Sequence, residues 1–237
     1  MAATSMPSDV EYSPVGEGLG MRDFWLYVWL RRAAVIAAHI TGLGLTIIIS
    51  LLSRPGTSLF SWHPMCMSFY CLCMTEGILL FSAEGSPFCF KSRKGKVRLH
   101  WFCQALVLIA SATGLSFMVA SKNVSERAHL TTWHSLLGIC TMATTVLQAV
   151  CGICMIFPKL LCLSSSLPKL KLYHATCGLV VYLLATVTVV LAMFSDWFQA
   201  TVRGVTWWVF LLLPFFPALV VMNQITNAYL PRKKLTS

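Results

Sequence analysis

The segment YHATCGLVVYLLATVTVVLAMFS, residues 173–195, contains no lysine, arginine, aspartate or glutamate. About 20 mainly apolar residues in a helix, rising 1.5 Å each, are enough to cross the roughly 30 Å hydrocarbon layer of a bilayer. One histidine, His174, stands at the second position of the segment. The segment therefore predicts a transmembrane helix that carries an imidazole at one end.

Similar apolar segments recur along the chain, which is 57% hydrophobic and 11% charged, against roughly a quarter charged in soluble domains. We expect an all-α integral membrane protein with six transmembrane helices and no large soluble domain. The chain would comprise an N-terminal tail, partly disordered, at 1–30, a membrane domain at 31–230 and a basic tail at 231–237. The six predicted spans are 33–52, 64–83, 99–120, 134–157, 173–195 and 205–226.

The formal charge of +10 could indicate a nucleic-acid partner, but the basic residues are distributed as in a membrane protein. Of the 18 lysines and arginines, all but Arg54, Lys122, Arg127 and Arg203 lie on one side of the six predicted spans. The positive-inside rule then places both termini in the cytosol. The glycosylation sequon at Asn123 lies in a loop that this topology places on the other side. We therefore expect a multi-pass protein that binds no nucleic acid.

Three more predicted spans start beside a histidine, in SWHPM at His63, RLHWF at His100 and TTWHS at His134. Consecutive spans run in opposite directions, so His63 and His134 fall on the outer side, and His100 and His174 on the cytosolic side. Each of the four follows or precedes a tryptophan or tyrosine, the residues that favour the headgroup boundary. The sequence thus predicts one pair of histidines near each membrane face.

Two imidazoles that face each other can hold a haem iron from both axial sides, which leaves no open position and favours electron transfer. Two pairs predict two b-type haems. Gly138 and Gly178 follow His134 and His174 by four residues, on the same helical face. A missing side chain there would let a flat macrocycle approach the helix.

The spacing of the histidines suggests an internal duplication. His63 and His100 are 37 residues apart, and His134 and His174 are 40 apart. Two copies of a helical hairpin would form a four-helix core from the second to the fifth spans, flanked by the first and the sixth.

Two other hypotheses compete with a haem protein: a transporter that uses the histidines for copper or zinc, and a non-catalytic structural protein with interfacial histidines. The transporter predicts more ionisable residues within the spans than Glu76 alone. Glu76 either accompanies proton movement or is solvated near the interface. We expect His39, inside the first span, to have no partner at its depth and to pack between helices.

The segments SRPGTSLFSWHP (53–64), LTTWHS (130–135), LKLYHATCGLVVYLL (170–184) and NQITNAYLPRKK (223–234) resemble the cytochrome b561 family, most closely its animal branch of cytochrome b561 domain-containing reductases. The resemblance covers about residues 30–234. It implies a transmembrane oxidoreductase that passes single electrons from cytosolic ascorbate through two haems to monodehydroascorbate radical or ferric iron. It also implies that His63 and His134 ligate the outer haem, and His100 and His174 the cytosolic one.

The resemblance further implies an ascorbate site among the basic residues before His100, for which the candidates are Arg93, Lys94, Lys96 and Arg98. The positive-inside rule alone would also place basic residues there. Candidates for the outer acceptor site are Arg54, Arg127 and His129. Animal relatives suggest the endoplasmic reticulum or vesicles rather than the plasma membrane, and the resemblance is compatible with a homodimer.

Overall fold

The computed structural model describes residues 25–82, 92–157 and 167–229, and within these residues all regular secondary structure is helical. Residues 25–30, which the sequence assigns to the N-terminal tail, already belong to the first helix; the rest of that tail and the C-terminal tail lie outside the described residues. The helices are α1 (Trp25–Ser53), α2 (Leu59–Leu79), α3 (Arg93–Val124), α4 (Trp133–Ile156), α5 (Leu167–Ala192), α6 (Asp196–Thr201), α7 (Val205–Leu212) and α8 (Phe215–Tyr229).

The helices run past the ends of the predicted spans. The 32 residues of α3 measure about 48 Å at 1.5 Å per residue, well beyond the hydrocarbon thickness. Ser92 starts this helix, because its side chain accepts a hydrogen bond from the backbone N–H of Gly95. Apolar length predicts where a helix meets lipid, but capping side chains decide where it begins.

The predicted sixth span is interrupted. Val205–Tyr229 is long and apolar enough to cross a membrane, but it is divided into α7 and α8. Pro214 lies at the interruption; proline has no N–H to donate, and its ring clashes with the carbonyl four residues earlier. The last span therefore consists of two successive helices.

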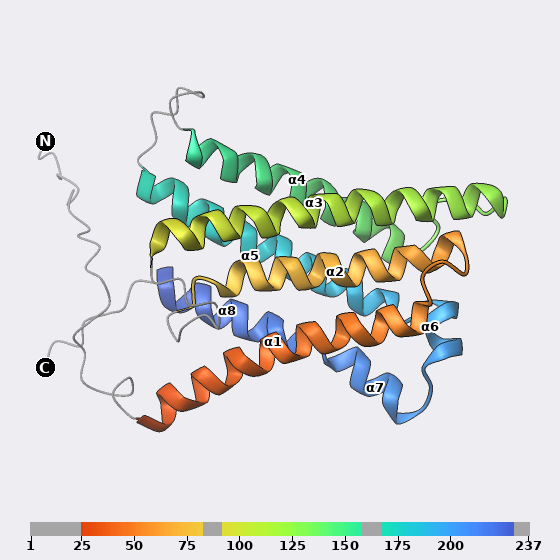
Figure 1. Ribbon diagram of the computed structural model, residues 1–237, viewed down its shortest axis with the longest axis horizontal. Helices are drawn as coiled ribbons and strands as arrows, with labels where there is room; N and C mark the ends of the chain where they lie inside the picture. The colour runs from red at the N-terminus through yellow and green to blue at the C-terminus, as the bar shows by residue number, and fades with distance from the viewer. Residues whose placement is uncertain (1–24, 83–91, 158–166, 230–237) are drawn as a thin grey trace, which may run out of the picture.

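Five segments of the described chain are long and apolar enough to span a membrane: α1, α3, α4, most of α5, and α7 with α8. The 21 residues of α2 are long enough, but they include polar groups such as His63, Thr75 and Glu76. Helices α1, α3 and α8 pack around α2, which lies between α1 and α3 in Figure 1. Protein neighbours, rather than lipid, therefore surround the polar groups of α2. Five of the six predicted spans are found directly, and we propose α2 as the sixth.

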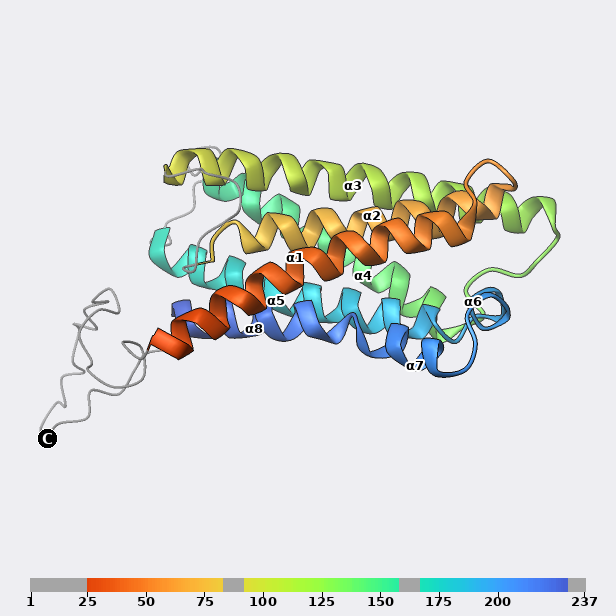
Figure 2. The ribbon, with the colours of Figure 1, turned by 60° about the horizontal axis from the view of Figure 1, so that its bottom comes forward.

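Two hairpins, α2–α3 and α4–α5, form the most extensive helix contacts, while α1 packs on α2 and α8, and α8 on α5 (Figures 1 and 2). Helix α1 begins and helix α8 finishes at the same end of the bundle, which we call the termini end. Helices α2 and α4 begin at the opposite end, the α6 end, near the short helix α6. This is the antiparallel arrangement from which the histidine pairs were predicted.

Large apolar side chains cover the outer faces of the bundle. Ile109 on α3, Leu147 on α4 and Val180 on α5 are each more than 60% exposed. A soluble monomer rarely exposes apolar surface on this scale, whereas lipid tails would cover it. The structure is that of a multi-pass membrane protein.

Candidate functional site

The four predicted histidines form two pairs, one at each end of the bundle. At the α6 end, the rings of His63 and His134 have centroids 6.3 Å apart and planes inclined at 82°. At the termini end, the rings of His100 and His174 are also 6.3 Å apart, with planes inclined at 83°. Helix direction alone therefore predicted which histidines come together.

Main-chain carbonyls orient three of these rings. The Nδ1 atom of His63 lies 3.0 Å from the carbonyl oxygen of Gly114, and that of His100 lies 2.9 Å from the carbonyl of Gly77. The Nδ1 atom of His134 lies 2.9 Å from the carbonyl of Thr188. A carbonyl can only accept, so each Nδ1 donates its proton. The lone pair of each neutral ring is then on Nε2, the state that a metal requires.

The fourth ring, His174, has a side chain as its neighbour instead. The amide nitrogen of Gln148 donates to the carbonyl of His174 and lies 3.1 Å from its Nδ1. A half-turn of this amide would present its oxygen to Nδ1, so Gln148 can support either tautomer of His174. The tautomer of this ring is therefore not fixed by the main chain.

The partners of the rings follow the same internal repeat as the rings themselves. His134 follows His63 by 71 residues, and Gln148 follows Gly77 by the same interval. His174 follows His100 by 74 residues, and Thr188 follows Gly114 by 74. The predicted duplication of a helical hairpin is thus also found in the hydrogen bonds, with Gln148 in the place of Gly77.

Both pairs fit a haem iron. A metal–imidazole bond of roughly 2.0–2.1 Å, with about 1.1 Å from the nitrogen to the ring centre, places the centroids of two opposed ligands about 6.3 Å apart. Both pairs have this separation. Within the described residues, no group of three or more histidines, cysteines or acidic residues could hold a metal ion alone. Two axial imidazoles suit a metal whose other ligands come from a porphyrin.

Glycines contribute to the sites in a different way from that predicted. A Cβ atom on Gly178 would lie 2.9 Å from the Gln148 amide, and one on Gly138 would lie 3.7 Å from Thr188. Both glycines therefore lie at the contact between α4 and α5. The glycine beside an imidazole is Gly152, where a Cβ atom would lie 3.3 Å from the His174 ring.

The four basic candidates for ascorbate lie on the first turns of α3, rather than in a loop. Lys96 precedes His100 by four residues and shares its helical face, while Lys94 and Arg98 lie on other faces. Lys96 is half-buried, whereas Arg93 is exposed. The fold therefore places Lys96 nearest in register to His100.

The three outer candidates lie in two separate loops at the α6 end. Arg54 lines a cavity of about 410 Å³ between the end of α1, the start of α2 and α6, together with hydroxyl side chains such as Ser58 and Thr201. Arg127 and His129 are exposed in the loop between α3 and α4, where the Nε2 atom of His129 lies 2.7 Å from Oδ1 of Asn123. The structure does not place the three in one site.

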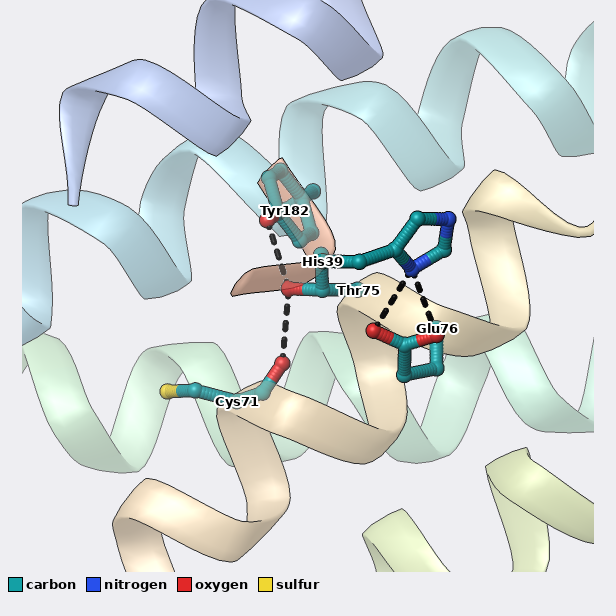
Figure 3. Close-up of polar contacts among 5 residues, drawn as sticks. All are labelled: His39, Cys71, Thr75, Glu76 and Tyr182. Carbon is teal, nitrogen blue, oxygen red and sulfur yellow. Dashed lines mark hydrogen bonds and ion pairs between the residues drawn. The ribbon is translucent and has the colours of Figure 1, made fainter. Parts of the chain in front are cut away.

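One polar contact was missed by sequence reasoning. The Nδ1 atom of His39 on α1 lies 2.8 and 2.7 Å from the two carboxylate oxygens of Glu76 on α2 (Figure 3). The prediction that His39 has no partner is therefore wrong. The signal was present, since both residues fall in the halves of their antiparallel helices that lie toward the termini end.

Comparison with known proteins gives the same assignment. Residues 62–199 match the family model described as eukaryotic cytochrome b561. The chain is 54% identical over 208 residues to the probable transmembrane reductase CYB561D1 of Mus musculus, which covers 87% of this chain and 90% of the relative. It is 46% identical over 211 residues to the transmembrane reductase CYB561D2 of Bos taurus, over 89% of this chain and 95% of the relative. The chain belongs to the eukaryotic cytochrome b561 family.

Proposed function

We propose that this protein is a transmembrane reductase that carries single electrons from cytosolic ascorbate, through two haems b, to monodehydroascorbate radical or ferric iron on the lumenal or extracellular side. Family membership and the names of the relatives indicate the coarser function, a transmembrane cytochrome b561 reductase. The observation that carries the finer proposal is the pair of equivalent histidine sites at opposite ends of one bundle.

In this proposal, His63 and His134 hold the outer haem, and His100 and His174 hold the cytosolic one. The haems supply one-electron chemistry when bound. The protein provides both axial ligands at each site, which leaves no position for oxygen and favours transfer of electrons over binding of gas. The carbonyls of Gly77, Gly114 and Thr188 keep three rings in the tautomer that binds a metal.

The proposed orientation places the termini end in the cytosol, in the membrane of the endoplasmic reticulum or of vesicles. The basic first turns of α3 lie at that end and support this orientation through the positive-inside rule. Ascorbate is a monoanion, and Lys96, one helical turn before His100, offers it a cation close to the cytosolic haem. The hydroxyl-lined cavity beside Arg54 is the candidate for an anionic acceptor at the outer end.

The test is a reduced-minus-oxidised absorbance spectrum of the purified full-length protein, with haem quantified per chain before and after addition of ascorbate. We expect a b-type spectrum, two haems per chain and reduction by ascorbate. A colourless chain after expression with ample haem would instead support a structural membrane protein. A bound metal without haem would support a metal transporter.

A further inference from the structure

The ion pair of His39 and Glu76 is enclosed within the membrane-spanning bundle. The side chain of His39 is 13% exposed and that of Glu76 is 18% exposed. Figure 3 shows the imidazole above the end of the carboxylate, with contacts from Nδ1 to both oxygens. An isolated charge at this depth is costly, so the pair as a unit determines which charge can be held there.

The pair can hold one additional proton. A carboxylate accepts, so Nδ1 of His39 donates, and the proton that can come and go is on Nε2 of the same ring. This Nε2 atom is buried and has no hydrogen-bond partner among the described residues. Proton arrival at Nε2 therefore breaks no existing hydrogen bond, and it changes the net charge of the pair from minus one to zero.

The surroundings of the pair contain other groups that are neutral at ordinary pH. The titratable groups that interact electrostatically with Glu76 are Cys73 on α2, Cys103 on α3 and Tyr182 on α5. The α8 segment contributes no acidic or basic residue. Tyr182 donates to Thr75, since Thr75 itself donates to the carbonyl of Cys71 (Figure 3). In the described part of the chain, no lysine or arginine pairs with Glu76.

The pair is also directly connected to one haem site. Glu76 precedes Gly77, whose carbonyl accepts the hydrogen bond from Nδ1 of His100. One turn of α2 therefore presents a carboxylate to α1 and a carbonyl to the cytosolic ligand on α3. The position equivalent to Glu76 in the second hairpin, 71 residues later, is Leu147. The second hairpin thus has no ionisable group at the repeated position.

We propose that the His39–Glu76 pair binds one proton when the cytosolic haem site is reduced and releases it when that site is oxidised again. This inference rests on the proposed function. Ascorbate monoanion supplies the balance, because it loses one electron and one proton to become the monodehydroascorbate radical anion. The electron goes to the cytosolic site and the proton to Nε2 of His39, by way of water at the cytosolic face. The pair acts through charge, and it touches neither substrate nor iron.

The experiment is a redox titration of the purified holoprotein at several pH values between 6 and 8, following both haems. We expect the cytosolic midpoint potential to fall as the pH rises, because a reduced site that binds a proton is favoured at low pH. Tenfold coupling between electron and proton corresponds to about 59 mV over the titration of the pair. The outer midpoint potential should change much less.

The decisive variant is Glu76→Gln, which keeps the shape of the side chain but removes its charge. The cytosolic potential should then lose its pH dependence and rise above the wild-type value at pH 8, with the two values converging at pH 6. His39→Asn tests the same idea from the other helix if the first variant folds poorly. Tyr182→Phe is the matched control, because it removes a neighbouring hydrogen bond but leaves the pair in place, so it should retain the pH dependence.

A wild-type protein that binds two haems, is reduced by ascorbate and has a pH-independent cytosolic potential would overturn this inference and leave the proposed function intact. The same holds if Glu76→Gln and His39→Asn both keep the wild-type pH dependence. Failure of the proposed function is distinct, since it would appear as a chain without haem or one that ascorbate does not reduce.

Discussion

The two ends of the bundle carry histidine pairs with the same ring separation but different support. At the α6 end, both rings are oriented by main-chain carbonyls, those of Gly114 and Thr188. At the termini end, one ring is oriented by a carbonyl and the other is in contact with the side chain of Gln148. A carbonyl persists through most substitutions at its residue, whereas an amide side chain is removed by one. The difference shows that the duplicated frame fixes ring geometry at both ends but leaves the chemistry of only one end open to side-chain change.

The largest expected effect comes from removing one ring from each pair. His63→Ala should remove the outer haem and His100→Ala the cytosolic one, so that each variant falls from two haems per chain to one. Transfer of electrons across the membrane should fall at least about 100-fold in both, because ligand loss removes an entire site. Haem content and absorbance spectra measure the first effect, and reduction of an acceptor enclosed in vesicles measures the second.

His129→Ala is the control for haem content, since His129 is exposed in a loop. If His63→Ala and His100→Ala lost the same spectral component, the assignment of one haem to each end would be wrong.

The next effect sharpens the contrast between carbonyl and side-chain support. Gln148→Ala should weaken retention of the cytosolic haem about 10- to 100-fold, the usual range for the loss of a group that orients a metal ligand, and leave the outer haem unchanged. Haem dissociation, followed by transfer to an excess of an acceptor protein, measures this loss. Gln199→Ala on α6 is the matched control, because its amide bonds only to the carbonyl of Phe194 among the described residues. Equal loss at both ends would contradict the proposed asymmetry.

A smaller effect compares the two hairpins. A Cβ atom on Gly114 would lie 3.0 Å from Cys66 and Met67, so the α2–α3 contact has no room for it. Gly114→Ala should destabilise the protein by about 1–2 kcal/mol through overpacking. Thr188, at the repeated position, shows that the α4–α5 hairpin accepts a side chain there. Thermal unfolding in detergent is the measurement.

Gly44→Ala is its control, since no atom lies within 4 Å of the added methyl group and a helical alanine should be neutral or stabilising. Unchanged stability in Gly114→Ala would mean that α2 and α3 separate easily at this point.

The smallest effect concerns the basic turns of α3. Lys96→Gln should raise the KM for ascorbate about 3- to 10-fold, with little change in kcat, because a partly solvated charge contributes roughly 1 kcal/mol to binding an anion. Lys94→Gln, on another face of α3, should change the KM less than twofold. Equal effects of the two substitutions would indicate a diffuse field rather than a site at Lys96.

Pairing of the histidines could be predicted because it depends only on helix direction and on the position of each ring near the start of a span. The interruption of the last span could also be anticipated from Pro214, since proline disrupts a helix regardless of its neighbours. Helix ends were less accessible, because Ser92 extends α3 through a cap that apolar length does not reveal.

Contacts that depend on helix rotation could not be predicted. The contact between His39 and Glu76 requires the faces of α1 and α2 to be turned toward each other, and depth alone does not give that rotation. Gln148 was missed for the same reason, since its role becomes visible only when the partner of His100 is known and the 71-residue interval is applied to it.

The division of each histidine pair between the two hairpins has a consequence for ancestry. His63 and His100 come from the first hairpin, and His134 and His174 from the second, so each hairpin supplies half of both sites. A solitary ancestral hairpin would have held a cofactor only by associating with another copy of itself. Gene fusion would then have joined an existing dimer into one polypeptide, after which Gln148 could diverge from its counterpart without changing both halves at once.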